Sequence, residues 1–141
     1  MEKKLSDACF RLESKILTIT LVQRKTDITA AISEGISQER LVFQEGCPYP
    51  AMVIFEGCPS FSRDGRIHFM TEGIRGIKAL ALVADNSVKQ TLSAFLVNKK
   101  KTAIPCRIFI DEGSAIRWLR RKLPNNTLLQ SIHTLQTVST L

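Results

Sequence analysis

A six-residue apolar run constrains the fold of this chain more than any other feature. Residues 79–84 read Ala-Leu-Ala-Leu-Val-Ala, between the charged residues Lys78 and Asp85. The run is too short for a core helix, and it lacks the polar alternation of a half-exposed strand, which indicates a strand buried on both faces. The run therefore predicts a strand in the interior of a sheet, of the kind found in α/β domains.

Further strands and helices alternate around this run. Strands are expected at 9–13, 16–22, 51–55 and 106–110, the first two joined as a hairpin through 13–15. Helices are expected from Asp27 to about Phe43, from about Arg63 to Gly73, from 85–87 to Lys99–Lys101, and from Asp111 to Pro124. The order ββαβαβαβα predicts a mixed five-stranded sheet with four helices, in which the later strands are parallel and joined by right-handed crossovers.

The spacing of apolar residues predicts which side of each element faces the core. Asp27 and Asp111 are expected to cap the first and fourth helices. The expected inward residues are Ile28, Ile32 and Ile36; Ile67, Met70 and Ile74; Val88, Leu92 and Phe95; Cys106, Ile108 and Ile110; and Ala115, Ile116, Leu119 and Leu123.

The length of 141 residues predicts one domain, at 1–123, followed by a polar C-terminal tail at 124–141. The tail has no Lys, Arg, Asp or Glu, and Leu128, Ile132 and Leu135 have helical spacing. It is either an extra helix docked on the domain or on a second subunit, or a frayed terminus.

The formal net charge of +7 lies entirely in the last third of the chain. Its clusters fall at expected helix C-termini (Lys99–Lys101 and residues 117–122), where the helix dipole stabilises cations. An anionic partner is the alternative, but one Trp and one Tyr offer few stacking platforms, so nucleic acid is not expected. No apolar run could span a membrane, and no charged-then-apolar leader follows Met1, so we expect a cytoplasmic protein.

Motifs for catalysis or metal binding are missing from the sequence. There is no CxxC pair, phosphate-binding glycine loop or serine nucleophile elbow, and the histidines are His68 and His133. Two Glu-Gly-Cys-Pro repeats, at 45–48 and 56–59, indicate turns at either end of one strand rather than a redox pair. We therefore expect no metal, no cofactor and no enzymatic activity.

Several stretches resemble one family. They are Ile77–Asp85, Ser87–Val88 with Ala94–Leu96, Pro105–Glu112, Ala115–Leu119 and Pro48–Val53. Over roughly residues 9–123 the chain resembles a family of uncharacterised bacterial proteins with the fold of anti-sigma-factor antagonists, the STAS or SpoIIAA-like fold. The resemblance implies that fold and carries no established activity.

In the better-known antagonists, a strand leads into an Asp-Ser-Ser-Gly turn that opens the second helix, and a kinase phosphorylates the second serine. The matching stretch here is Ser62-Arg63-Asp64-Gly65. Asp64 then occupies the acceptor position, which puts the phosphorylation switch in doubt, while Ser60 and Ser62 remain possible acceptors. Asp64 and Ser62 also have an ordinary explanation as helix-capping residues.

These observations predict a non-enzymatic regulatory module with a STAS-like fold that binds a protein partner and self-associates. Its binding site is expected at Ser60, Ser62, Arg63, Asp64 and Gly65, with the face of the second helix. The alternative is a small-ligand protein that holds an apolar or anionic molecule between its sheet and the second and third helices.

Overall fold

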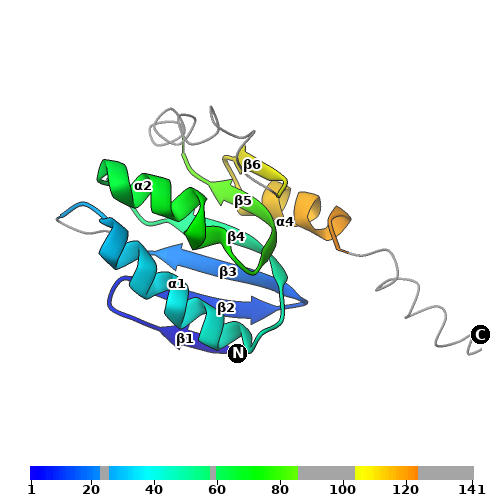
Figure 1. Cartoon of the computed structure of the whole chain (residues 1–141). Helices are drawn as coiled ribbons and strands as arrows, with labels where there is room; N and C mark the ends of the chain where they lie inside the picture. The colour runs from blue at the N-terminus through cyan, green and yellow to red at the C-terminus, as the bar shows by residue number, and fades with distance from the viewer. Residues whose placement is uncertain (23–25, 58–59, 86–103, 124–141) are drawn as a thin grey trace, which may run out of the picture.

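The computed structural model describes residues 1–22, 26–57, 60–85 and 104–123. A six-stranded mixed sheet forms its centre, and the spatial order of the strands equals their chain order (Figure 1). The first three strands are antiparallel, and the last four run parallel to one another. The strands are β1 (Glu2–Lys4), β2 (Ala8–Glu13), β3 (Ile16–Leu21), β4 (Tyr49–Phe55), β5 (Ile77–Val83) and β6 (Cys106–Phe109).

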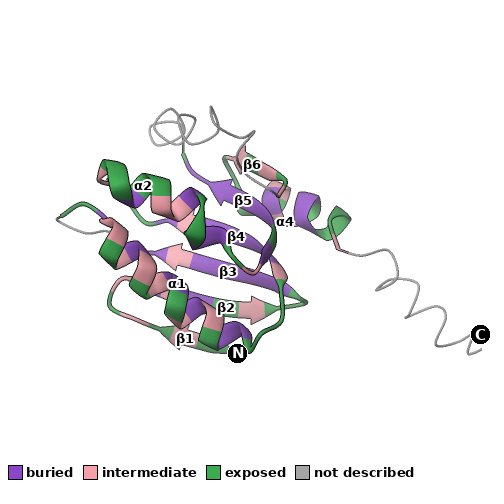
Figure 2. Cartoon of the chain, in the orientation of Figure 1, coloured by how far each residue is buried: buried purple, intermediate pink, exposed green. Residues whose placement is uncertain are grey.

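Helices cover both faces of this sheet, as the doubly buried strand requires. α1 (Ala30–Gln44) and α2 (Arg63–Met70) lie on one face, followed by the short 3₁₀ helix η1 (Glu72–Ile74), and α4 (Glu112–Arg121) lies on the other (Figure 1). Along β5, Leu80 and Leu82 pack on the α1–α2 side, and Ala79 and Ala81 pack on the α4 side. Figure 2 shows the three central strands, β3, β4 and β5, as mainly buried. The α/β prediction is confirmed.

The sheet has one strand more than the five that the sequence predicts. β1 pairs with β2 at the N-terminus, where Lys3 lies opposite Phe10. Its sequence, Glu-Lys-Lys, has no apolar alternation, and pairing with β2 alone makes it a strand. The described residues contain three α-helices; the predicted third helix and the tail at 124–141 lie outside them.

The predicted start and inner face of the first helix are wrong in part. Thr29, not Asp27, is the N-cap of α1, and its hydroxyl oxygen accepts from the N–H of Ile32 at 3.3 Å. Ile28 lies before the helix, but it is buried in the core as expected. The buried residues of α1 are mainly polar (Ser33, Ser37, Arg40, Phe43 and Gln44), whereas Ile32 and Ile36 are only partly buried against the core.

The last helix matches its prediction more closely. Asp111 caps α4, because its carboxylate accepts from the N–H of Ser114 at 2.7 Å. Ala115 and Leu119 are buried as expected, and Trp118 joins them. Ile110, which was expected to face inward with Cys106 and Ile108, is instead 59% exposed at the end of β6.

Candidate functional site

The segment before α1 pairs with the loop before α2. The N–H of Ile28 donates to the carbonyl of Ser60 at 2.9 Å, and the N–H of Ser62 donates to the carbonyl of Ile28 at 3.1 Å. These bonds flank a short parallel bridge between Ile28 and Phe61. Because α1 follows β3 and α2 follows β4, the pairing brings the starts of both helices together at the carboxyl ends of two parallel strands (Figure 1).

Ser62 and Asp64 form the cap of α2. The Ser62 hydroxyl oxygen accepts from the N–H of Gly65 at 3.1 Å, and the hydroxyl also bonds to the Asp64 carboxylate. The hydrogen bond with Ser62 lowers the pKa of Asp64, and backbone bonds from Gly65 and Ala30 lower it further. The Asp64 carboxylate thus places a fixed negative charge at the start of both helices, where the helix dipole favours it.

Ser60 lies beside this cap and belongs to the exposed surface. Its hydroxyl donates to the Asp27 carboxylate at 2.6 Å, which links the loop before α2 to the segment before α1. Among the predicted phosphate acceptors, Ser60 is exposed and Ser62 is partly buried. Ser60 is therefore the more accessible hydroxyl.

The outer side of α2 carries the remaining exposed groups. Arg63 and Arg66 are exposed, and Ile67 is 53% exposed. Met70 and Ile74 are buried as expected, but the prediction that Ile67 also faces the core is wrong, because α2 turns Gly65 inward instead. An exposed apolar side chain, with two exposed arginines on the same helix, is therefore available to a partner.

Ser60, Ser62, Arg63 and Asp64 lie together at the start of α2. Gly65 belongs to the same turn but is buried, and it serves the packing of α2 on Ile28. The second Glu-Gly-Cys-Pro repeat ends outside the described residues, so Cys58 has no described position. We call the partly buried Ser62 and the exposed residues Ser60, Arg63, Asp64, Arg66 and Ile67 the α2 surface.

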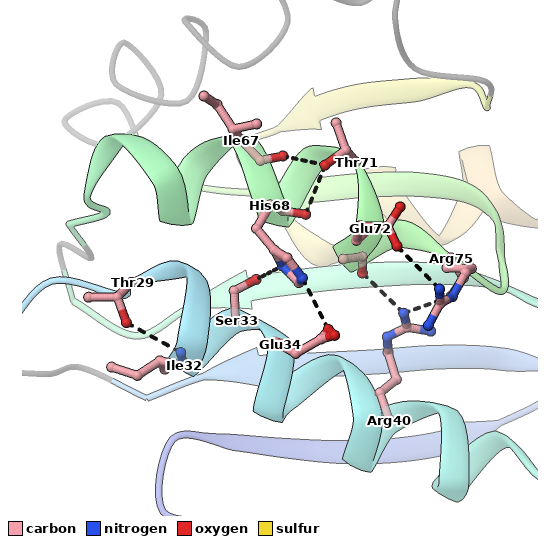
Figure 3. Close-up of polar contacts among 11 residues, drawn as sticks. Thr29, Ile32, Ser33, Glu34, Arg40, Ile67, His68, Thr71, Glu72 and Arg75 are labelled. Atoms are coloured by element: carbon pink, nitrogen blue, oxygen red, sulfur yellow. Dashed lines mark hydrogen bonds and ion pairs between the residues drawn. The ribbon is translucent and has the colours of Figure 1, made fainter.

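A polar network between α1 and α2 was not predicted. Figure 3 shows His68 of α2 between two residues of α1: its Nδ1 lies 2.7 Å from Ser33 Oγ, and its Nε2 lies 3.2 Å from a carboxylate oxygen of Glu34. A neutral ring protonated at Nε2 satisfies both contacts, by accepting from Ser33 and donating to Glu34. Ser33 is buried, and the network ties the two helices together.

Arg40 joins α1 to the turn between η1 and β5. It is 1% exposed, and its guanidinium donates to the carbonyls of Gly73 (3.0 Å) and Arg75 (2.7 Å) and to the side chain of Gln44. Burial lowers the pKa of Arg40 to about 10, and the charge of Arg75 contributes to the shift. Gln44 continues the clamp by donating to the carbonyls of Cys47 and Gly76.

The sequence did not predict the His68 network or the hydrogen bonds of Arg40 and Gln44. Ser33, Ser37, Arg40 and Gln44 have the pattern of a solvent-exposed face opposite the isoleucine stripe of α1. Their own spacing of three to four residues was the available signal, since it defines a continuous polar stripe on one helix face. The sequence of this polar stripe does not indicate that it faces the interior.

Two hollows lie beside these elements. The first, under α1, has about 20 Å³ of free space, enough for about one water molecule, and is lined by Ser33, Ser37, Arg40 and mainly apolar residues. The second is an open groove of about 280 Å³ between α4 and the β2–β3 hairpin, on the opposite face of the sheet. Arg11 and Arg120 line it together with Glu13 and Glu112.

The basic cluster at the end of α4 lies where the sequence placed it. Arg120 and Arg121 occupy the last turn, and the Lys122 ammonium lies 5.3 Å from the centre of the Trp118 ring. The helix dipole and the aromatic ring both stabilise cations at these positions. These charges therefore contribute to the structure of the helix end itself.

The described residues contain no group of three or more His, Cys, Asp or Glu side chains that could hold a metal ion. Their cysteines, Cys9, Cys47 and Cys106, are free thiols, and burial raises the pKa of Cys106 to about 11. None of the described helices combines the length and apolarity that a bilayer crossing requires.

The fold and the α2 surface define an α/β domain with a mixed six-stranded sheet and a capped strand–loop–helix at one end. A sequence family described as a domain of unknown function (DUF7793) matches residues 10–123, and the chain belongs to this family. No curated protein and no solved structure matches the chain.

Proposed function

We propose that this protein is a non-enzymatic regulatory module with a STAS-like fold, which binds a protein partner through the α2 surface and self-associates. The observation that carries the proposal is the way two helix starts are held together. Backbone hydrogen bonds of Ile28 with Ser60 and Ser62 hold the surface in place, while Ile67 and two arginines remain exposed on it. Rigid support with exposed apolar and charged groups is typical of a recognition surface.

The chemistry of the α2 surface indicates what a partner must present. Ile67 offers an apolar anchor, and Arg63 and Arg66 beside it offer bidentate donors to carboxylates. A partner segment with an apolar side chain flanked by Asp or Glu is complementary to this arrangement. Asp64 is already held by hydrogen bonds within the turn and adds a repulsive element against acidic groups in the wrong register.

Phosphorylation of Ser60 is a means of regulating this surface. The Ser60 hydroxyl donates to Asp27, so a phosphate would replace that bond with repulsion between two anions. The loop before α2 would then separate from the segment before α1. Modification would thereby change the surface that the partner contacts.

Affinity capture from the protein's own host tests the proposal. We expect Ile67→Asp to lose the partner that the wild type captures, because it puts a charge in the centre of the surface. Val42→Asp is the matched control, since Val42 is 67% exposed on α1, and it should retain the partner. A Ser60/Ser62/Asp64 triple alanine variant should also lose it. Recovery of the same partner by all variants would refute the site.

The alternative function is small-ligand binding, and the groove beside α4, which is lined by two arginines and two glutamates, favours a ligand with charged groups over an apolar one. Arg11 and Arg120 both line this groove, whereas the hollow under α1 has room for about one water. Native mass spectrometry of the protein from its host tests it. A bound small molecule that Arg120→Gln releases would favour this function, and a ligand-free spectrum would oppose it.

A further inference from the structure

The outer edge of β6 has no partner strand among the described residues. β6 is the last strand of the sheet, and it pairs only with β5 on its inner side. An edge strand exposes backbone N–H and C=O groups that can pair with another strand. The identity of a pairing strand depends on which backbone groups of β6 point outward and on the side chains beside them.

The hydrogen bonds to β5 fix which groups of β6 point outward. The carbonyls of Pro105 and Phe109 accept from Leu80 and Ala84 of β5, both at 2.9 Å. Because backbone groups alternate between the two sides of a strand, the N–H and C=O groups of Cys106 and Ile108 point away from the sheet. The outward groups are therefore those of every second residue.

The side chains of this edge are mainly apolar. Cys106 and Ile108 are partly buried on the α1–α2 side, and Phe109 packs on Trp118 on the other side, with 5.6 Å between the ring centres. Ile110 follows the strand and is 59% exposed. Arg107 is the one charged residue of β6, and its guanidinium lies 5.3 Å from the centre of the Phe109 ring.

The opposite edge of the sheet is protected by comparison. β1 consists of Glu2, Lys3 and Lys4, and charged side chains, lysine above all, discourage edge pairing. Of the two edges, only β6 has the composition of a strand that pairs.

We propose that β6 pairs antiparallel with β6 of a second copy of this chain, which joins the two sheets into one across a two-fold axis. This surface specifies the self-association named in the proposed function, and it is separate from the α2 surface.

The side chains select one register for the pair. With Ile108 opposite Ile108 of the second copy, the outward groups meet, Cys106 lies opposite Ile110, and Arg107 lies opposite Phe109. Each Arg107 then gains a second aromatic ring. Shifting the centre to Arg107 would put the two guanidinium groups opposite each other, and like charges at that position destabilise a sheet.

Sedimentation equilibrium of the full chain tests the proposal. The wild type should be a dimer, and Ile110→Lys should raise its dissociation constant at least about tenfold, since the two outer positions become charged. Val42→Lys, a change of the same kind at an exposed site on α1, should leave the dissociation constant unchanged. Far-UV circular dichroism verifies that both variants fold. A monomeric wild type, or equal effects of the two variants, would overturn the proposal.

Disulfide trapping tests the register. In a background with Ser at positions 9, 47 and 58, Ile110→Cys should oxidise to a covalent dimer through Cys106 of the second copy, with an added oxidant accepting the two electrons per bond. The dimer should disappear when Cys106 is also changed to Ser. A dimer that persists without Cys106, or no covalent dimer at all, would refute this register.

Discussion

The backbone of Gly65 in α2 packs directly against the carbonyl group of Ile28, with no space for a side chain between them. A Cβ atom added at Gly65 would overlap the Ile28 carbonyl oxygen and lie 3.0 Å from the Ser62 hydroxyl oxygen. The same carbonyl accepts the N–H of Ser62. The contact therefore holds the starts of α1 and α2 together, and it depends on a missing side chain.

Gly65→Ala should therefore destabilise the protein by at least about 2 kcal/mol, because the backbone must move to admit the methyl group. Gly35→Ala is the matched control: Gly35 lies within α1 with open space around its added Cβ. There the same change should stabilise by up to about 1 kcal/mol, because alanine has the higher helix propensity. Urea unfolding of both variants measures the difference. A Gly65→Ala protein that is as stable as Gly35→Ala would contradict the close packing.

Arg40 provides the second prediction. Arg40→Met should cost about 2–4 kcal/mol, because it leaves the buried carbonyl of Gly73 and the partly buried carbonyl of Arg75 without their donor. Arg40→Lys should restore only part of this, since an ammonium cannot reproduce the guanidinium fork.

Arg75→Met is the control for a surface arginine. Arg75 pairs with Glu72 at 3.2 Å, but both side chains are well exposed, so the loss should stay below about 1 kcal/mol. Denaturant unfolding gives all three values. An Arg40→Met protein as stable as Arg75→Met would show that the clamp contributes nothing.

The sequence predicted the layers of this fold well and the contacts at the site less well. The apolar run of β5 and the cap at Asp111 are local signals, so periodicity and capping chemistry were enough to find them. The buried side of α1 was missed because Arg40 and Gln44 face inward only to bind carbonyls of a turn more than thirty residues away. Such long-range partners leave no local pattern.

At the candidate site, too, the features with a local sequence signal were predicted and those that depend on long-range contacts were not. The turn at Ser62–Gly65 was found from its sequence, because a serine before a helix start is a capping signal. Ile67 was misplaced because its spacing from Met70 and Ile74 suits a buried stripe, but the chain leaves α2 at Met70 and continues as a 3₁₀ helix, which ends that periodicity. The hydrogen bond from Ser60 to Asp27 could not be predicted from the sequence, because only the fold brings these two distant residues together.

The network of Ser33 and His68 gives the third prediction. Ser33→Ala and His68→Ala should each destabilise the protein by about 1–2 kcal/mol, because each leaves the other without its partner. The double variant should cost less than the sum, with a coupling of about 1 kcal/mol. Ser33→Ala combined with Gln38→Ala, an exposed position on α1, should be additive. Additivity in both pairs would mean that the 2.7 Å contact has no energetic role.

Asp111 gives a prediction about acid stability. The hydrogen bond from the Ser114 N–H lowers the pKa of Asp111 in the folded protein, so the unfolded chain binds the proton more readily. Folding is then favoured above the unfolded carboxyl's pKa, and this contribution is lost as pH falls through the lower folded value. Asp111→Asn keeps a capping oxygen but has no charge, so it isolates this effect. We expect the stability gap between wild type and Asp111→Asn, measured by urea unfolding, to be largest near neutral pH and to close at strongly acidic pH. A gap that stays constant with pH would show that the charge of Asp111 does not stabilise α4.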